Sequence, residues 1–413
     1  MRRTVFAILI FLSFSVVKAQ FAISNTESVR TPMMVVNDKW DAPAVIALGS
    51  DDVIHFSFDE MSHVYRRYIC RVTHHNADGS RSELSEIDYI DGFNDFVIEE
   101  WENSHNTTQL YTHYAFALPN DDLLLKVSGN YRVEVFDEED DAETPVVTFD
   151  FSVVEPMVDI RANVSGDTDR TYNEGEQQLS FVVNHSRCNV VSPANDIIPV
   201  VYQNRRRDNA VVVSKPTYVT GNEVEYVHNE KLIFDAGNEY RRFELTDPNS
   251  PGMNVEDVVF HQGAYHALLY VDKARVSYSN DIDENGRFYV NTLEGYGMPI
   301  EADYVNVHFA VKLPYRTGGN YYLSGDFCGS GFDKSNILFY EEEEGYYFTS
   351  HLLKLGVYNY QYVWVPDGGG QKVSTANTEG DFYNTENEYL IYVYHREFGA
   401  RYDRLVGFLA VRS

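Results

Sequence analysis

Apolar and polar residues alternate with a period of two along much of this chain. In the run from Val305 to Leu313, valine, phenylalanine or leucine occupies every second position. Such alternation directs one set of side chains to a core and the other to solvent, as in a β-strand. Because no long window keeps the 3.6-residue apolar period of a helix, the sequence predicts an all-β protein. Three further runs show the same pattern: residues 54–58, 131–135 and 358–364.

Clusters of glycine, asparagine and aspartate separate these runs, for example at residues 77–79, 128–130 and 283–286. Short strands about ten residues apart, broken by such clusters, are typical of antiparallel β-sandwiches. We therefore expect tandem antiparallel β-sandwich domains. The expected division is a signal peptide over 1–19, an N-terminal β-sandwich domain over 20–157, a middle β-rich domain over 158–313 and a C-terminal domain over 314–413.

The N-terminus has the pattern of a secretory signal peptide. Arg2 and Arg3 precede an apolar run from Val5 to Val17, and Ala19 offers a small residue at a cleavage site before Gln20. The run is about 13 residues long, short of the ~20 that a membrane-spanning helix needs. No cysteine follows it, so we expect no lipid anchor and a soluble exported chain.

The charge balance narrows the choice of partners. The chain has 413 residues and a net charge of −30, from 33 basic and 63 acidic side chains. Such a surface repels phosphate backbones and anionic membranes, so nucleic acid is not expected as a partner. With 44% hydrophobic residues, the chain can bury real cores and is not expected to be disordered.

One stretch starts like a calcium-binding loop. Asp281–Gly286 reads Asp-Ile-Asp-Glu-Asn-Gly, but the twelfth position of the loop is Thr292, where a bidentate glutamate is required. A glycine-closed β-turn is the competing interpretation, and we favour it. We predict no metal site, no catalytic site and no cofactor.

The cysteines and histidines support the same expectation. Cys70, Cys188 and Cys328 lie more than 100 residues apart, and we expect three buried free thiols, with one disulfide as the alternative. His74 and His75 are adjacent, so on a strand they point to opposite faces and do not chelate one metal. A catalytic Cys328 would need a histidine and an orienting partner that the sequence does not identify.

One stretch of the C-terminal segment resembles modules found in enzymes that act on glycans. Residues 321–327, 345–348 and 353–363 form a strand series that resembles the immunoglobulin-like early-set modules of starch and glycogen enzymes. Sugar binding in such modules relies on exposed tryptophan platforms, and here only Trp364 is available. An exported glycan-binding β-sandwich module is therefore the alternative function, and Trp364 as a core residue is the competing interpretation.

The last signal is a series of short polar and aromatic stretches in a fixed order. They resemble one family, the plug proteins of the Bacteroidetes type IX secretion system. The resemblance covers essentially the whole chain after the signal peptide, although no single stretch carries a mechanism. The stretches are Tyr89–Phe93, Ser104–Thr108, Tyr111–Tyr114, Leu118–Asn120, Lys126–Tyr131, Tyr240–Glu244, Asp272–Arg275, Asn285–Phe288, Ala302–Phe309, Glu379–Gly380, Thr385–Tyr389 and Asp403–Gly407.

The resemblance implies a non-enzymatic periplasmic protein, peripheral at the outer membrane. Its partner would be the large outer-membrane translocon barrel, whose periplasmic end it would close when no substrate shuttle is engaged. A small-molecule ligand is not expected, and the surface that meets the barrel stays unassigned. The chain departs from the family pattern at His74–Gly79, where the family has a cysteine and an aromatic residue. Thr385, Glu386 and Asn387 are candidates for a contact site, but in a turn that enters a strand we expect Thr385 and Asn387 to act as local backbone caps.

Overall fold

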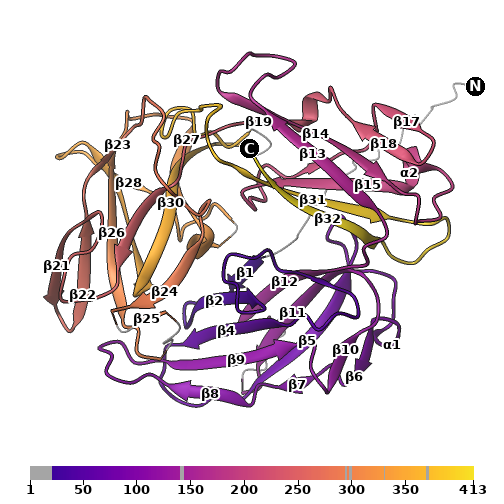
Figure 1. Ribbon diagram of the computed structural model, residues 1–413. Coiled ribbons are helices and arrows are strands. Elements are labelled where there is room, and N and C mark those ends of the chain that lie inside the picture. Colours follow the sequence, from indigo (N-terminus) through magenta and orange to yellow (C-terminus); the bar gives the residue numbers. More distant parts are fainter. Residues whose placement is uncertain (1–20, 140–143, 294, 297–299, 330, 369–371) are drawn as a thin grey trace, which may run out of the picture.

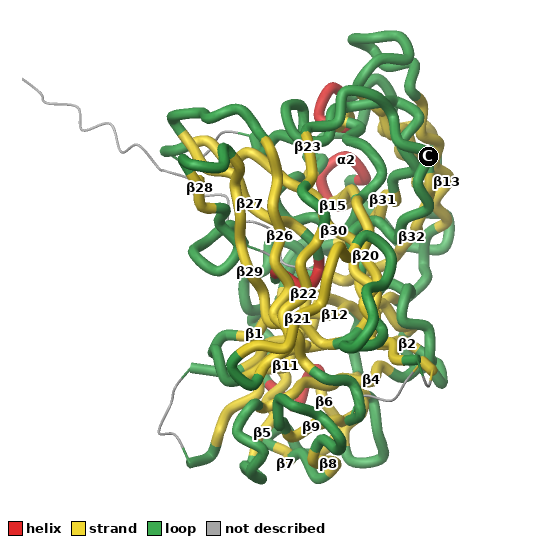
Figure 2. The backbone as a smooth tube through the Cα atoms, turned by 90° about the vertical axis from the view of Figure 1, so that its left-hand side faces the viewer, coloured by secondary structure: helices red, strands yellow, loops and turns green. Residues whose placement is uncertain are grey.

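The computed structural model describes residues 21–139, 144–293, 295–296, 300–329, 331–368 and 372–413, and the proposed signal peptide lies outside these residues. The described chain is all-β, as the alternation predicted, and its α-helices are single turns at Glu86–Tyr89 (α1) and Pro193–Asp196 (α2). Its strands form three β-sandwiches (Figure 1). In Figure 2 the first sandwich lies at the lower end of the molecule and the other two lie above it.

Sandwich 1 is built from the first part of the chain. One sheet has the order β1-β12-β11-β5-β7, with β3 beside β12, and the facing sheet has the order β2-β4-β9-β8. Phe56 of one sheet meets Phe149 and Phe151 of the other edge-on in the core. Its strands are β1 (Phe21–Ser24), β2 (Val29–Val36), β3 (Val45–Ala47), β4 (Ile54–Glu60), β5 (Tyr68–His75), β6 (Ile90–Gly92), β7 (Phe96–Val97), β8 (Glu100–Asn103), β9 (Thr112–Leu118), β10 (Leu123–Leu125), β11 (Gly129–Asp137) and β12 (Val147–Val154).

Sandwich 2 joins two separate parts of the chain. The sheet β13-β14-β18-β17, with β19 beside β14, faces the sheet β16-β15-β31-β32, whose last two strands come from the C-terminal end. In Figure 1 the yellow β31 and β32 lie beside the magenta β15. The elements are β13 (Asp159–Ser165), β14 (Glu176–Asn184), β15 (Ile197–Gln203), β16 (Val211–Val212), β17 (Tyr218–Thr220), β18 (Glu223–Tyr226), the 3₁₀ turn η1 (Glu230–Leu232), β19 (Ile233–Asp235), β31 (Glu388–His395) and β32 (Arg404–Arg412).

Sandwich 3 is formed by the chain between β19 and β31. One sheet has the order β20-β30-β24-β25, with β27 beside β30, and the other has the order β21-β22-β26-β29-β28, with β23 parallel to β26. The elements are β20 (Arg241–Leu245), β21 (Val255–His261), β22 (Ala264–Leu269), β23 (Asp272–Lys273), β24 (Phe288–Thr292), β25 (Gly295–Tyr296), β26 (Tyr304–Lys312), β27 (Gly319–Ser324), the 3₁₀ turn η2 (Asp326–Cys328), β28 (Phe339–Glu341), β29 (Tyr346–Lys354) and β30 (Gly356–Pro366).

The sheets divide the chain differently from the predicted boundary between residues 313 and 314. β26 ends at Lys312 and pairs with β29 on the far side of that boundary, so both strands belong to sandwich 3. The segment 314–413 is divided as well, because β31 pairs with β15 of sandwich 2. We propose that the three sandwiches are the domains, with the third inserted into the second.

Tyrosine fills much of the interior. The largest fully buried side chains are tyrosines, among them Tyr68, Tyr131, Tyr304 and Tyr358. A tyrosine ring buries a large apolar area, and its hydroxyl needs a partner once it leaves water. Some buried tyrosine hydroxyls find their partner in a neighbouring sandwich, as Tyr304 does at Asp59.

Candidate functional site at the sandwich junctions

A buried ion pair joins sandwiches 1 and 3. Asp59 of β4 accepts a hydrogen bond from Lys354 Nζ of β29 at 2.5 Å, and both side chains are 1% exposed. The Tyr304 hydroxyl donates to the same carboxylate at 2.6 Å, and His113 Nδ1 lies 2.7 Å from its other oxygen. Burial acts to raise the pKa of Asp59, but Lys354 and His113 outweigh it and hold that pKa below its usual value.

The same junction is closed by a loop of sandwich 1. The carboxylate of Asp303, just before β26, accepts hydrogen bonds from the backbone N–H groups of Thr108 and Gln109 and from the Thr108 hydroxyl, at 2.7–3.0 Å. The Tyr111 hydroxyl donates to the Ala302 carbonyl at 2.8 Å. The stretches that carry the resemblance, 104–108, 111–114 and 302–309, therefore meet at one junction.

A second junction joins sandwiches 1 and 2. Asp403 accepts a hydrogen bond from the Ala77 N–H at 3.0 Å, and the Asp403 N–H donates to Asn76 at 3.2 Å. The Tyr394 hydroxyl of β31 donates to the Asn130 side chain of β11 at 2.8 Å. The loop at which the chain departs from the family pattern therefore contacts another domain of the same chain.

His74 lies buried beside this junction. Its Nδ1 lies 2.9 Å from the Ser82 hydroxyl and its Nε2 lies 3.2 Å from the Ser128 carbonyl, an arrangement that suits the neutral imidazole. Burial lowers the pKa of His74 to about 4. Gly129 makes this packing possible, because a Cβ at that position would lie 2.3 Å from His74 Nε2.

A polar network within sandwich 2, at the point where the chain returns from sandwich 3 to β31, centres on Asn387. Its amide donates to Gln177 and to the Ala236 carbonyl at 2.9 and 2.8 Å, and its oxygen accepts from Asn204 at 2.6 Å. These partners lie more than 150 residues away in sequence, so the prediction that Asn387 is a local cap is wrong. Thr385 bonds locally to the Phe382 carbonyl and also to that of Gly237, in the connection from β19 to β20.

The calcium-like stretch is a turn. Asp283 accepts hydrogen bonds from the backbone N–H groups of Tyr240 and Asn285, and burial raises its pKa to about 7. Asn285 and Gly286 both have positive φ, at 54° and 88°, as a turn of this type requires. Asp281 pairs with Arg275. Within the described ranges no group of three or more His, Cys, Asp or Glu side chains is arranged to hold a metal ion.

The remaining residues singled out in the sequence are structural. Cys70, Cys188 and Cys328 are free thiols, and burial raises the pKa of all three, which keeps them protonated and weakly nucleophilic. Cys70 and Cys188 are buried, whereas Cys328 is only partly buried. Trp364 is 3% exposed and packs against Tyr321 in the core of sandwich 3, so it offers no sugar platform.

Sequence reasoning missed a cluster of charge at the centre of the molecule. Arg205, in the turn after β15, and Arg287, just before β24, both pair with Glu388 of β31, at 3.2 and 2.5 Å. One signal was visible in the sequence: Arg205–Arg207 are three consecutive arginines in a strongly acidic chain.

These observations define a class of protein: three all-β domains locked together by buried polar junctions. Residues 29–155 match the family model described as the type 9 secretion system plug protein 1st domain. The chain is also similar to a hypothetical protein from Parabacteroides merdae, known from a crystal structure at 2.30 Å resolution. The two are 40% identical, with a TM-score of 0.92, over 96% of this chain and 100% of that one. No curated protein matches the chain.

The chain belongs to the type IX secretion system plug protein family. This is a family of secretion plug proteins and not of enzymes, and membership implies association with the secretion pore and a location in the cell envelope. The described residues hold no helix with the length and apolarity that crossing a bilayer requires.

Proposed function

We propose that this protein is a non-enzymatic periplasmic plug that closes the periplasmic end of the type IX outer-membrane translocon pore. It does so by protein–protein contact and without chemistry. Blocking a wide pore requires a folded body that keeps its shape when pressed against the opening.

The observation that carries the proposal is the set of three buried junctions. Each pair of sandwiches is joined by a hydrogen bond between buried side chains: Lys354 to Asp59, Tyr394 to Asn130 and Arg287 to Glu388. In the first of these junctions both partners of the ion pair are 1% exposed. Interfaces between domains of one chain are often small and mobile. Here, separating the sandwiches would expose or orphan buried charged groups, which is costly. The three domains therefore act as one rigid body.

The acidic surface supplies a second element of the proposal. A net charge of −30 would orient the protein toward basic loops at the barrel rim and speed the encounter. Raising the salt from about 50 to about 500 mM strongly screens the attraction between exposed charges. If the affinity of the protein for the barrel rim barely changes over that range, electrostatic steering is not part of the function.

A pull-down from detergent-solubilised outer membranes tests the contact. The proposal expects recovery of a very large barrel protein, and binding to starch or glycogen resin without such a barrel would favour the glycan-binding alternative. A deletion strain tests the closure. Loss of the protein should raise outer-membrane permeability, most clearly when the substrate shuttle is also absent. Unchanged permeability in that double deletion would rule out a gating role.

A further inference from the structure

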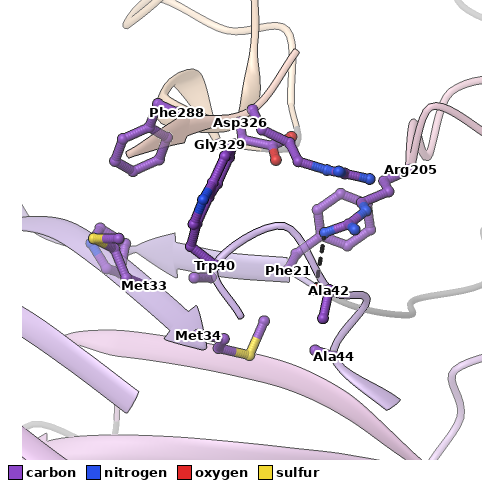
Figure 3. A pocket seen from close by; sticks show the side chains of 13 residues that line it. Phe21, Met33, Met34, Trp40, Ala42, Ala44, Arg205, Phe288, Asp326 and Gly329 are labelled. Atoms are coloured by element: carbon purple, nitrogen blue, oxygen red, sulfur yellow. Dashed lines mark hydrogen bonds between the residues drawn. The ribbon is translucent and has the colours of Figure 1, made fainter. Parts of the chain in front are cut away.

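A cavity of about 100 Å³ lies where the three sandwiches meet. Figure 3 shows it with Phe288 on one side of Trp40 and Arg205 on the other. The unpartnered donors here, Nε and Nη1 of Arg287, are enclosed atoms, and all three guanidinium nitrogens of Arg205 donate to protein acceptors. The polar groups around this cavity therefore hold the domains together, and recognition of a partner is left to the surface.

One sheet of sandwich 3 turns an apolar face to solvent. In the sheet β21-β22-β26-β29-β28, Val307 and Phe309 of β26 point into the core, so the residues between them point outward. Figure 1 shows this sheet on the left-hand side of the molecule, and Figure 2 views that side directly. The outward apolar residues, which we call the outer face of sandwich 3, are Val259, Leu268, Ala310, Phe339, Phe348 and Leu352.

The residues of this face are neighbours across the strands. The register places Ala310 of β26 beside Phe348 of β29, and Phe348 beside Phe339 of β28. Leu268 lies on β22, which pairs with the other side of β26. Leu268 is 41% exposed and Phe348 is 39% exposed. Large apolar side chains that are exposed together, and not singly, mark contact sites on soluble proteins.

A sheet of sandwich 1 shows the ordinary arrangement. Arg132 and Glu134 of β11 point away from the core, and Glu134 lies opposite Arg71 of β5. An antiparallel sheet with one side toward water commonly carries such polar residues on that side. In a chain of net charge −30, the uncharged centre of the outer face of sandwich 3 is the exception. Aromatic residues without charges are typical of the centre of a protein–protein interface.

Two histidines near the middle of the face bond to each other. His266 Nδ1 lies 2.9 Å from His308 Nε2, and His308 Nδ1 lies 2.7 Å from the Ser350 hydroxyl. Burial and the neighbouring His266 lower the pKa of His308, so its ring is neutral at pH 7. Because these polar atoms have partners within the face, a protein that covers them leaves their hydrogen bonds intact.

Acidic residues border the face on both outer strands. Asp257 lies on β21, and Glu341 of β28 begins the run Glu341–Glu344, with Lys312 at the end of β26 between the two borders. A second copy of this chain would bring together two acidic borders and two bodies of net charge −30, which opposes self-association. The partner that fits is a different protein, with an apolar centre and basic residues around it.

The size of the face suits the centre of an interface. Five strands spaced about 4.8 Å apart, each rising about 3.3 Å per residue, give a patch of about 20 by 20 Å, on the order of 400 Å². A stable complex buries about 800 Å² on each partner. The outer face therefore supplies about half of such an interface, and its acidic border supplies further contact area.

We propose that the outer face of sandwich 3 is the surface that docks on the periplasmic rim of the translocon barrel. This inference rests on the proposed plugging function and adds the place of contact to it. Apolar side chains of the rim pack against Leu268, Ala310 and Phe348. Basic side chains of the rim pair with Asp257 and with Glu341–Glu344.

Charge placed in the face tests the inference on the full chain. Leu268→Glu and Phe348→Glu should each lower the recovery of the barrel from detergent-solubilised outer membranes at least about tenfold, because docking would bury an unpaired carboxylate. Leu124→Glu is the matched control on β10 of sandwich 1, where Leu124 is 50% exposed, and it should recover as much barrel as the unaltered protein. Undiminished recovery by both face variants would overturn the inference and leave the plugging role intact. If the unaltered protein recovers no barrel, the plugging role is refuted and the docking face with it.

Photo-cross-linking locates the contact without adding a charge. The photoreactive residue p-benzoylphenylalanine in place of Phe348 should form an adduct with the barrel, and the same residue in place of Leu124 should not. An adduct of position 348 with a second copy of this chain, or none with the barrel, would overturn the inference. Melting temperatures check that each variant is folded, and little change is expected because the altered side chains are partly exposed.

Discussion

At the junction of sandwiches 1 and 3, each oxygen of Asp59 has a partner, whereas at the centre of the molecule two donors of Arg287 have none. Both places hold buried charge supplied by different domains. The first is closed and fixes the domains against each other. The second is also buried, but two of its donors are left without a partner among the described residues. The contrast indicates that buried charge is fully paired where it fixes sandwiches 1 and 3 against each other, and is incompletely paired where all three sandwiches meet.

Breaking the ion pair at the junction of sandwiches 1 and 3 should cause the largest loss of stability. Lys354→Met keeps the length of the side chain but leaves Asp59 buried without its cation, which costs about 3–5 kcal/mol of stability. Urea unfolding followed by fluorescence measures the loss. Lys312→Met, an exposed lysine on β26, is the matched control and should change little. Adding Asp59→Asn to Lys354→Met should restore much of the loss, and a double variant that is no more stable than the single one would contradict the pairing.

The second-largest loss of stability is expected at low pH, where His74, beside the junction of sandwiches 1 and 2, becomes protonated. The unfolded chain protonates His74 below its ordinary pKa of 6.5, but the folded chain does so only near 4. Stability is therefore complete above pH 6.5 and falls as the pH drops toward 4, by about 3 kcal/mol from this residue. His74→Gln, whose amide can donate to the Ser128 carbonyl, should flatten the pH dependence of the unfolding free energy. An unchanged pH slope in this variant would assign the effect to other histidines.

Removing the Asn387 side chain from the polar network of sandwich 2 should have an intermediate effect on stability. Asn387→Ala leaves the Ala236 carbonyl and the Gln177 side chain with one partner fewer in a buried place, which costs about 1–3 kcal/mol. Thermal melting measures it. The neighbouring Glu386→Ala alters an exposed side chain and should change the melting temperature little. Equal losses of stability in the two variants would mean that the Asn387 side chain does not stabilise this network.

The smallest expected change in stability comes from removing a single tyrosine hydroxyl, and it should depend on whether that hydroxyl has a hydrogen-bond partner. Tyr394→Phe removes a buried hydrogen bond to Asn130 and should cost about 1 kcal/mol. The buried hydroxyl of Tyr392, two residues earlier on the same strand, has no partner among the described residues. Tyr392→Phe should therefore be neutral or slightly stabilising in the same melting experiment. The opposite order of the two variants would contradict this assignment.

The strands themselves were predictable from the sequence, and their partners were not. The alternation over 305–313 predicted β26, and that over 358–364 predicted most of β30, because a half-buried strand shows its period locally. Pairing of β15 with β31 joins Ile197 to His395. An apolar period of two does not indicate which distant strand pairs with a given strand. The boundary predicted between residues 313 and 314 therefore differs from the division that the sheets show.

The junctions were partly visible and the central cavity was not. The resemblance picked out residues 104–108, 111–114 and 302–309, but only the folded chain brings Thr108 to Asp303. Trp40, Arg205, Arg287 and Asp326 line the cavity from four distant segments, and of these only Arg205 lies in a conspicuous run, the three arginines 205–207. Sites assembled from loops of different domains leave no local spacing to detect.

The return of β31 and β32 to sandwich 2 also sets an order of events for a chain that emerges from its N-terminus. Sandwiches 1 and 3 hold all their strands in continuous stretches, so each can fold once its own last strand has appeared. Strands β13–β19 must wait for about 150 further residues before their facing sheet is complete, and long loop closure slows such pairing. Until the final strand arrives, the core of sandwich 2 stays open and vulnerable to proteases and aggregation. Truncating the last strand should therefore spare the first and third domains and unfold the second.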